Sequence, residues 1–472
     1  MPPGPVTAWM ILPFAALLGA IALAPLFAHA WWERHYPKVA WGLGALSLLW
    51  YLAVAREWHH PLNTAHEYLS FICLIGSLFV VSSGIHITVK GEATPAANVL
   101  ILALGGILAN LIGTTGASMV LIRPFLRVNK YRLTAHHVVF FIFIVSNVGG
   151  SLTPIGDPPL YLGYLKGIPF FWTVRALFWK WAFGMGWLLL IFYFVDRLNF
   201  LRAPREVRIK ETANEKWRFE GARNLGWLAA ILVALFVSRP PLLREALMVA
   251  AAVGSWFTTP RRIHKANQFS WEPIREVAIL FAGIFATMFP ALLWLEQNAG
   301  QLGLHSTTQF YWSCGLLSAV LDNAPTYLNF LSAQFGLFVT PSIVDGVRHL
   351  ASGGAFALTG PDSAHAVEIL RTFRGIQQWH PEALGNGEVP LGIIQVCHML
   401  KNHPKYIAEI SIAAVFFGSA TYIGNGPNFM VRSIALQWGV RMPGFLGYIL
   451  RYSLPFLLPL FAATWWIFFR SE

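Results

Sequence analysis

Long apolar runs, separated by short polar loops, make up most of this chain. A hydrocarbon slab of about 30 Å needs roughly 20 apolar residues in a helix. The runs that reach or approach that length are Trp9–Phe27, Val39–Ala55, Tyr68–Ile87, Phe170–Val195, Leu225–Val237, Leu242–Phe257, Val277–Leu295 and Phe445–Phe469. The pattern predicts an all-α polytopic membrane protein with about ten full spans.

Two further apolar stretches carry polar interruptions near their middles. Ala97–Phe125 is interrupted by Gly113–Ser118 (GTTGAS), and Phe310–Phe338 is interrupted by Asp322–Thr326 (DNAPT). Irregular backbone at membrane depth is tolerated only where protein or a water-filled cavity satisfies its polar groups. We therefore expect two re-entrant hairpins, over 97–126 and 308–340, each entering and leaving on one side.

Two segments in the two halves of the chain resemble each other. Gly150–Pro159 reads GSLTPIGDPP and Gly418–Pro427 reads GSATYIGNGP, with six of ten positions identical. Matched interruptions of apolar segments are typical of inverted-repeat transporters whose substrate site lies at the bilayer midplane. The pair predicts two discontinuous helices, over 135–165 and 405–437.

These elements divide the chain into four parts. Residues 1–65 are predicted N-terminal transmembrane helices, and residues 66–197 a first inverted repeat with hairpin 97–126 and broken helix 135–165. Residues 198–274 are predicted to form a cytoplasmic linker and two short connecting helices. Residues 275–472 are predicted to form the second repeat, with hairpin 308–340, broken helix 405–437 and an external loop 341–404 that holds short helices of its own.

The positive charge of the chain is interpreted as a topology signal. A formal net charge of +12 would suggest nucleic-acid binding in a soluble protein, but here Lys and Arg gather in the loops, eight of them within Asp196–Arg223. Cytoplasmic loops of membrane proteins are rich in Lys and Arg. We expect this segment in the cytoplasm, the N-terminus outside, a bacterial inner-membrane location, the lipid bilayer as a partner and no nucleic acid.

The breaks and hairpin tips are rich in hard oxygen donors, which suit sodium or lithium. The sharpest candidates are Asp157 and Asp322, because a carboxylate at membrane depth is costly and functional by default. A proton and a sodium ion would compete for the same carboxylate oxygens. The alternative is that each Asp only caps a half-helix. The full candidate set is Thr114, Thr115, Ser118, Asn147, Ser151, Thr153, Asp157, Asp322, Asn323, Ser419, Thr421, Asn425 and Asn428.

A further acidic residue, Glu409, lies near the start of the second broken helix and one turn from Lys405. We interpret the two as an interfacial ion pair, with a proton-pathway residue as the alternative.

The motifs SNVGGSLTPIGDPP (Ser146–Pro159), GTTGASMVLIRPFLR (Gly113–Arg127) and LDNAPT (Leu321–Thr326) resemble the ion transporter superfamily of NhaD-type sodium/proton antiporters, arsenite permeases and citrate transporters. The NhaD-type group is the closest likeness. The resemblance implies a homodimer and elevator-like movement of a transport domain. It also carries the ion-binding positions onto Thr114, Thr115, Thr153, Asp157, Asp322, Asn323, Thr421 and Asn425.

Two departures from the superfamily patterns bear on the substrate. NhaD-type antiporters usually continue the TPIGD core with a threonine-rich stretch, whereas this chain reads PPLYLGYLKG over Pro158–Gly167. Dicarboxylate symporters usually carry Ser-Asn-Thr at the hairpin tips, whereas here the tips are TTGAS and DNAPT. The first leaves the transported cation open, and the second argues against a carboxylate substrate.

The sequence predicts a secondary active transporter that exchanges Na⁺ or Li⁺ for H⁺, with no resident cofactor. The alternative is a sodium-coupled transporter of a small anion such as citrate, a dicarboxylate or arsenite. An intramembrane enzyme is disfavoured because the sequence has no HExxH motif and no spacing that pairs Ser118 with a histidine.

Overall fold

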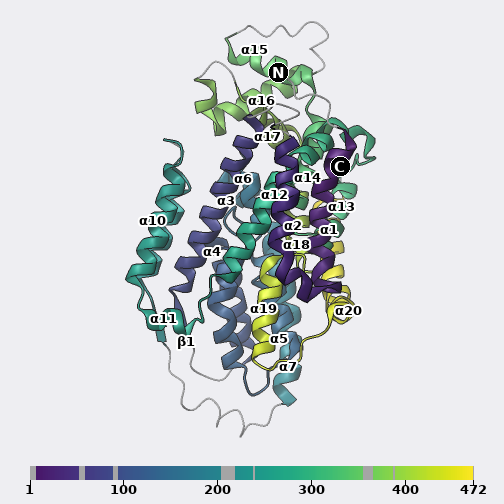
Figure 1. The fold of residues 1–472 in the computed structure, drawn as a ribbon. Helices are drawn as coiled ribbons and strands as arrows, with labels where there is room; N and C mark the ends of the chain where they lie inside the picture. The colour runs from purple at the N-terminus through teal and green to yellow at the C-terminus, as the bar shows by residue number, and fades with distance from the viewer. Residues whose placement is uncertain are drawn as a thin grey trace.

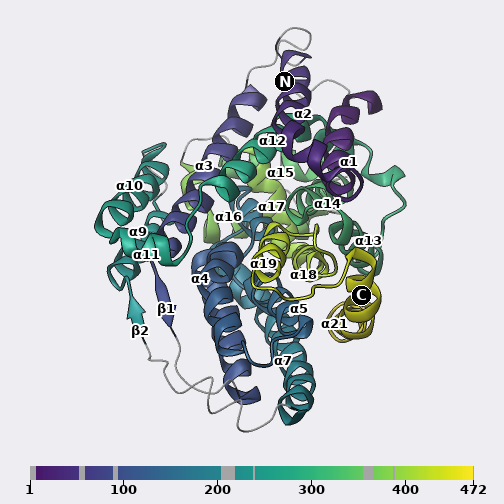
Figure 2. The ribbon, with the colours of Figure 1, turned by 60° about the horizontal axis from the view of Figure 1, so that its bottom comes forward.

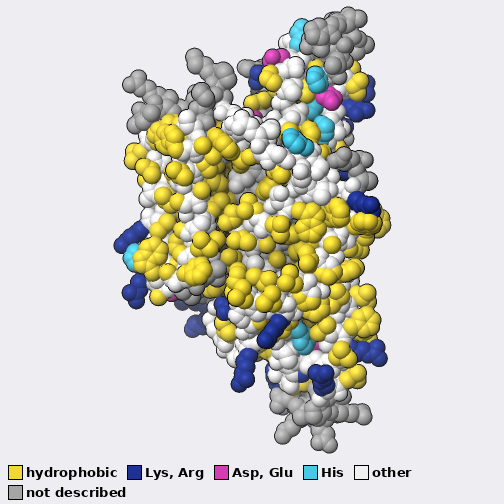
Figure 3. All heavy atoms as spheres, turned by 90° about the vertical axis from the view of Figure 1, so that its right-hand side faces the viewer, with side chains coloured by type: hydrophobic (Ala, Val, Ile, Leu, Met, Phe, Trp, Pro, Cys, Tyr) yellow, Lys and Arg dark blue, Asp and Glu magenta, His cyan; other side chains and the backbone are white. Residues whose placement is uncertain are grey.

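The computed structural model describes residues 7–50, 52, 59–88, 94–202, 218–237, 240–353, 365–385 and 389–470. Six helices within these ranges are long and apolar enough to cross a membrane. Hydrophobic side chains cover a broad zone across the middle of the face that Figure 3 shows, as expected for a surface that faces lipid. The predicted class, an all-α polytopic membrane protein, is confirmed.

A group of N-terminal helices packs with α12 on one side of the molecule (Figure 1). The members are η1 (Ala8–Ile11), α1 (Leu12–Phe27), α2 (His29–Trp50), α3 (His59–Ser83) and α12 (Glu272–Gln297). The apolar run that starts at Val39 lies within a longer helix, since α2 already begins at His29. An apolar run marks only the part of a helix that hydrocarbon requires, and α2 continues through the polar turns before it.

The middle of the chain packs against α3 and carries the only two strands among the described residues. The predicted short helices appear as α9 (Arg223–Ala234) and α10 (Leu243–Thr258), followed by α11 (Arg261–Ala266). Strand β1 (His86–Thr88) pairs antiparallel with β2 (Arg218–Glu220), with His86 opposite Glu220. These elements lie at the edge of the molecule (Figure 2). Most of the basic segment, 203–217, lies outside the described residues.

The first predicted hairpin is the single element α4 (Pro95–Val128), which folds back at Gly113 (φ 77°, ψ 156°). The side-chain amides of Asn98 and Asn129 exchange reciprocal hydrogen bonds of 2.8 and 2.9 Å. A straight helix would hold two residues 31 positions apart at about 46 Å. The two arms are therefore antiparallel, and Gly113 supplies the positive φ that a side chain would oppose.

The second hairpin consists of α13 (Thr307–Val320) and α14 (Asn323–Phe338), joined by Leu321 and Asp322. The rings of Phe310 and Phe330 lie 6.2 Å apart, which a straight helix would place at about 30 Å. Tyr406, at the start of α18, contacts both arms through Phe310 and Phe338. The base of this hairpin therefore lies beside the start of α18.

Two helices are broken where the repeated motifs predicted it. The first comprises α5 (Ala135–Ile144), the turn η3 (Val148–Gly150) and α6 (Pro158–Leu165), and the second comprises α18 (Pro404–Gly418) and α19 (Gly426–Gln437). Helix α5 packs on α19 and α6 packs on α18. In Figure 1, α6 lies above α5 whereas α19 lies below α18, so the chain runs in opposite directions through the two breaks.

The remaining helices enclose this core. They are α7 (Phe170–Arg202), η4 (Ala299–Gln301), α20 (Phe445–Tyr448), the π-helical η7 (Ile449–Leu457) and α21 (Leu458–Phe468). The region predicted as an external loop holds α15 (Pro341–Ala351), α16 (Ala366–Trp379), η6 (Pro381–Leu384) and α17 (Leu391–Asn402), with a small apolar core of its own. We call this end of the molecule, at the top of Figure 1, the insertion pole. The domain boundaries and the membrane sidedness stay predictions.

Candidate functional site

The two hairpin tips and the two helix breaks meet at the carboxylate of Asp157. Its Oδ1 accepts hydrogen bonds from Thr114 Oγ1 (2.7 Å) and Asn425 Nδ2 (3.0 Å), and its Oδ2 accepts one from Asn323 Nδ2 (2.5 Å). All four residues are buried, with Asp157 fully shielded from solvent. Each of the four interrupted elements therefore contributes one polar side chain to a single point.

The four contacting residues form two pairs related by the internal repeat. Thr114 and Asn323 are separated by 209 positions, and Asp157 and Asn425 by 268 positions. These are the same offsets that align the two hairpins and the two broken helices. Asn425 in the second repeat is thus equivalent to Asp157 in the first, so the second repeat carries a neutral amide where the first carries a carboxylate. Asp157 is therefore the one acidic side chain among these four contacting residues.

A second pair of contacts repeats in the same way. Thr153 Oγ1 donates to the carbonyl of Asn110 (2.7 Å), and Thr421 Oγ1 donates to the carbonyl of Ala319 (2.6 Å). Thr153 and Thr421 thus each connect a helix break to the hairpin of the same repeat. Their hydroxyl oxygens support the site geometry and do not contact Asp157.

A chain of asparagine side chains joins the two breaks. Asn425 Nδ2 also lies 3.1 Å from Asn147 Oδ1, and Asn147 Nδ2 donates to Asn428 Oδ1 at 2.7 Å. Asn428 in turn donates to the carbonyls of Gly418 and Thr421, which lack helical partners because α18 ends there. These three amides satisfy the broken backbone and fix the position of Asn425.

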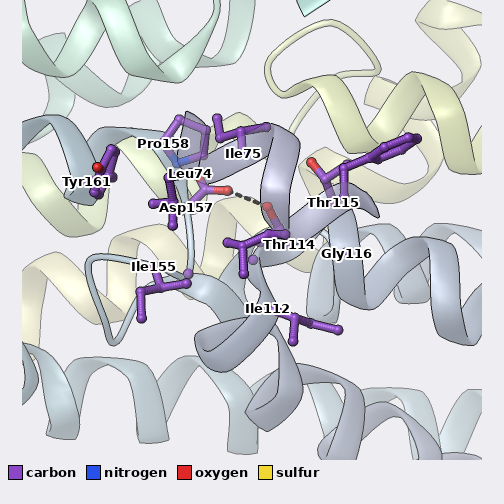
Figure 4. Close-up of a pocket in the computed structure, with 14 residues that line it drawn as sticks. Leu74, Ile75, Ile112, Thr114, Thr115, Gly116, Ile155, Asp157, Pro158 and Tyr161 are labelled. Atoms are coloured by element: carbon purple, nitrogen blue, oxygen red, sulfur yellow. Dashed lines mark hydrogen bonds between the residues drawn. The ribbon is translucent and has the colours of Figure 1, made fainter. Parts of the chain in front are cut away.

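A small cavity lies on the open side of Asp157, between α3 and the tip of α4 (Figure 4). Its volume is about 30 Å³, room for one or two water molecules. Figure 4 shows the Thr114 hydroxyl and the Asp157 carboxylate pointing toward each other at its wall. The lining residues are apolar apart from Thr114, Thr115, Asp157 and Tyr161, and none of them is basic.

Asn323 carries the one site oxygen that stays unsatisfied. Its Oδ1 is buried and has no hydrogen-bond partner in the described part of the chain, while its Nδ2 is held by Asp157. Buried polar atoms are almost always paired, so this oxygen is an acceptor still available beside the carboxylate. An amide oxygen and a carboxylate on adjacent elements are the donor set that a sodium ion prefers.

The other predicted ligands lie around this point without touching Asp157. Asp322 is half-buried and caps α14 through the N–H of Ala324 at 3.1 Å. Ser118 pairs with the hydroxyl of Ser146 at 2.8 Å. Thr115 lines the cavity, and Ser151 and Ser419 each bond a carbonyl three residues earlier. Whether any of them binds a transported ion stays a prediction.

Sequence reasoning missed Asn110, which braces the first break. Its Nδ2 donates to the carbonyl of Gly149 (2.6 Å), and its Oδ1 accepts from the N–H groups of Leu152 and Thr153. An asparagine inside the apolar stretch GGILANLIG was the available signal, since polar residues at membrane depth bind backbone freed by a break.

Sequence reasoning also missed a buried ionic cluster at the base of α4. Asp196 on α7 is fully buried, binds the Arg132 guanidinium through both oxygens, and accepts from Asn98 Nδ2 at 2.9 Å. His137 Nε2 lies 2.9 Å from the same carboxylate. Although His136, His137 and Asp196 are close enough to hold a metal ion, the guanidinium already occupies the carboxylate. We therefore interpret the cluster as a structural contact that joins α4, α5 and α7.

Comparison with known proteins agrees with this architecture. No curated protein matches the chain. A family model described as "Putative citrate transport" matches residues 4–469, which confirms the likeness to the superfamily of ion and citrate transporters. The specific closeness to NhaD-type antiporters stays a prediction. Matched over nearly its whole length, the chain belongs to this family of membrane transporters.

Proposed function

We propose that the chain is a secondary active transporter that exchanges Na⁺ or Li⁺ for H⁺ at Asp157. The observation that carries the proposal is a fully buried carboxylate, held by three neutral donors, beside an orphan amide oxygen and a cavity without basic lining residues. The three donors stabilise the charged carboxylate, and its attraction for a cation is strong because water is excluded. One cation at a time, either Na⁺ or H⁺, then neutralises the site.

The second candidate is cation-coupled uptake of citrate or a related anion, which the family description favours. Such an anion carries several negative charges, and Asp157 would repel it unless bound sodium screened the carboxylate. A cavity of about 30 Å³ also leaves no room for a tricarboxylate in this conformation. A citrate transporter would need a further opening of the site, whereas a cation exchanger needs only the existing ligands.

The resemblance to the superfamily supports three further parts of the proposal. The chain works as a homodimer, its transport domain moves as an elevator between the two faces of the membrane, and the membrane is the bacterial inner membrane with the N-terminus outside. The lipid bilayer and the small ion are its other partners. Cross-linking in native membranes tests the dimer, and accessibility labelling of the insertion pole tests the sidedness.

The experiment that separates the two candidates uses the purified chain in sealed liposomes. An inward Na⁺ gradient should raise the luminal pH, with Li⁺ effective and K⁺ inactive, because each cation that enters expels a proton. Labelled citrate supplied outside with Na⁺ is the second arm. Citrate accumulation without proton exit would replace antiport with symport, and flux in neither arm would refute both.

A further inference from the structure

Glu409 is a second buried carboxyl group, and its surroundings are opposite to those of Asp157. The residue is fully shielded on α18, and neither Oε1 nor Oε2 has a hydrogen-bond partner in the described part of the chain. The expected ion pair with Lys405 does not form within 4 Å, although both residues lie on the same face one turn apart. Burial shields Glu409 from water, and Lys405 lies too far away to form a hydrogen bond with it.

The groups around Glu409 offer no compensating charge at contact distance. Tyr311, Cys314 and Lys405 are near enough to interact with it electrostatically. Cys314 is committed to the carbonyl of Ile410 (3.7 Å) and Tyr311 to the carbonyl of Phe461 (3.0 Å). Among the elements packed against α18, α14 carries Tyr327, α7 carries Lys180, and α17 carries His398 and Lys401.

An isolated carboxylate in such a place takes up a proton, because burying the ion without a partner costs far more than burying the neutral acid. Asp157, in contrast, receives three side-chain hydrogen bonds that favour its charged form. The two buried carboxyl groups thus differ in their hydrogen bonding, and different surroundings for two carboxyl groups are a recurrent way of dividing acid and base roles.

The position of Glu409 connects the site with the insertion pole. It lies five residues into α18, which begins at Pro404, and nine residues before Gly418, where the helix breaks. At 1.5 Å per residue the break is about 13 Å further along the axis. A proton held there lies between the Asp157 site and the insertion pole.

We infer that Glu409 is a second proton-binding site, a relay carboxyl group in the half of α18 that leads from the insertion pole to the cation site. Its role in coupling rests on the proposed function, but its protonation does not. Glu409 holds a proton at neutral pH and exchanges it with the pathway to Asp157. We assign it protons and not sodium, because the described groups that interact with it are a tyrosine, a cysteine and a lysine, with no second carboxylate among them.

The first test examines protonation on the wild-type protein and needs no variant. Dicyclohexylcarbodiimide is a hydrophobic reagent that reacts with protonated carboxyl groups, and mass spectrometry of peptides locates the adduct. We expect modification of Glu409 at pH 7, unaffected by Na⁺, and none at the ion-paired Glu67 (2.7 Å from Lys166). Absence of the Glu409 adduct at pH 7 overturns the proposal.

The second test examines coupling with Glu409→Gln, the neutral isostere of the protonated acid, and Glu409→Leu. We expect both variants to fold and to keep Na⁺-induced stabilisation, while Na⁺-driven proton flux falls at least about tenfold. Ser411→Ala, which removes another buried polar group of α18, is the packing control and should keep the flux. Wild-type flux in both Glu409 variants would overturn the relay, as would loss of the Na⁺ response, which would merge Glu409 with the Asp157 site.

Discussion

Replacing Asp157 with asparagine should weaken cation binding about 100-fold while leaving the fold intact. The new side-chain oxygen can keep the hydrogen bonds from Thr114 and Asn425, which both reach the same carboxylate oxygen. The new amide nitrogen then faces Asn323, whose own amide can turn to present its orphan oxygen. The turned Asn323 amide nitrogen then takes the unpartnered place of its former oxygen, so the substitution removes the charge and leaves one unpaired polar group there, as before.

The loss of charge sets the size of the effect. Two unit charges about 3 Å apart attract by roughly 5 kcal/mol at an effective dielectric constant of about 20. If half of that survives the loss of the ion's hydration, the Kd for Na⁺ rises about 100-fold. At a Na⁺ concentration about 100 times the wild-type Kd, ligand stabilisation then falls from about 2.7 to about 0.4 kcal/mol.

Thermal unfolding of the detergent-solubilised protein, with Na⁺ replaced stepwise by a bulky organic cation, measures this difference. Wild type should show a Na⁺-dependent rise in Tm, and Asp157→Asn should show almost none at a similar baseline Tm. Ile75→Val is the matched control, because Ile75 lines the same cavity without a polar contact, and it should respond like wild type. A wild-type Na⁺ response in Asp157→Asn would refute the reasoning.

Three further predictions concern the surroundings of the site. Asp322→Asn keeps the cap on α14, since asparagine caps as well as aspartate. If the Asp322 charge takes part in exchange, this substitution should reduce the flux. Unchanged flux would leave Asp322 with the capping role alone. Gly156→Ala should prevent stable folding or transport, because the added Cβ would lie 2.0 Å from the carbonyl oxygen of Gly150; in the control Gly186→Ala, the added Cβ meets nothing within 4 Å and the substitution should be tolerated. Expression level and ion flux measure the two variants. A fully active Gly156→Ala would contradict the tight turn. Burial lowers the pKa of His398, outside the spanning segments, from 6.5 to about 4. Because the unfolded segment takes up a proton below about pH 6.5 and the folded one does not, the amides of α16 and α17 should be less protected from exchange at pH 5 than at pH 7, once each rate is divided by the intrinsic exchange rate at that pH. His398→Gln should remove that difference in protection.

Sequence periodicity and repetition predicted the architecture well, for identifiable reasons. The breaks at Gly150–Pro159 and Gly418–Pro427 carry Pro and Gly, which oppose helical backbone at any depth. The hairpins could be predicted because their apolar stretches are too long for one span and are interrupted at their centres. Such signals are local, so one sequence suffices to read them.

The contacts within the site were less predictable, because they depend on how distant segments meet. The sequence favoured Asp157 and Asp322 equally, yet it is the neighbouring Asn323 that reaches Asp157. A difference of one residue on the first turn of α14 decides which side chain points to the centre. Asn110 and Asp196 were missed because their partners, Gly149 and Arg132, lie 39 and 64 positions away.

The start of α2 shows a different limit. Hydropathy identifies the part of a helix that lies in hydrocarbon and carries no information on where the helix ends outside it. The segment between Ala28 and Val39 is helical, although it contains charged residues and a proline. Helix ends therefore depend on caps and neighbouring helices more than on the apolar run.

The central claim is that one buried carboxylate, Asp157, binds either a proton or a sodium ion. The most direct test is to add Na⁺ to the detergent-solubilised protein in weakly buffered solution and to count the protons released with a pH-sensitive dye. The account predicts proton release that saturates with Na⁺, is reproduced by Li⁺, and disappears in Asp157→Asn. Sodium binding without proton release, or release that persists in Asp157→Asn, would contradict it.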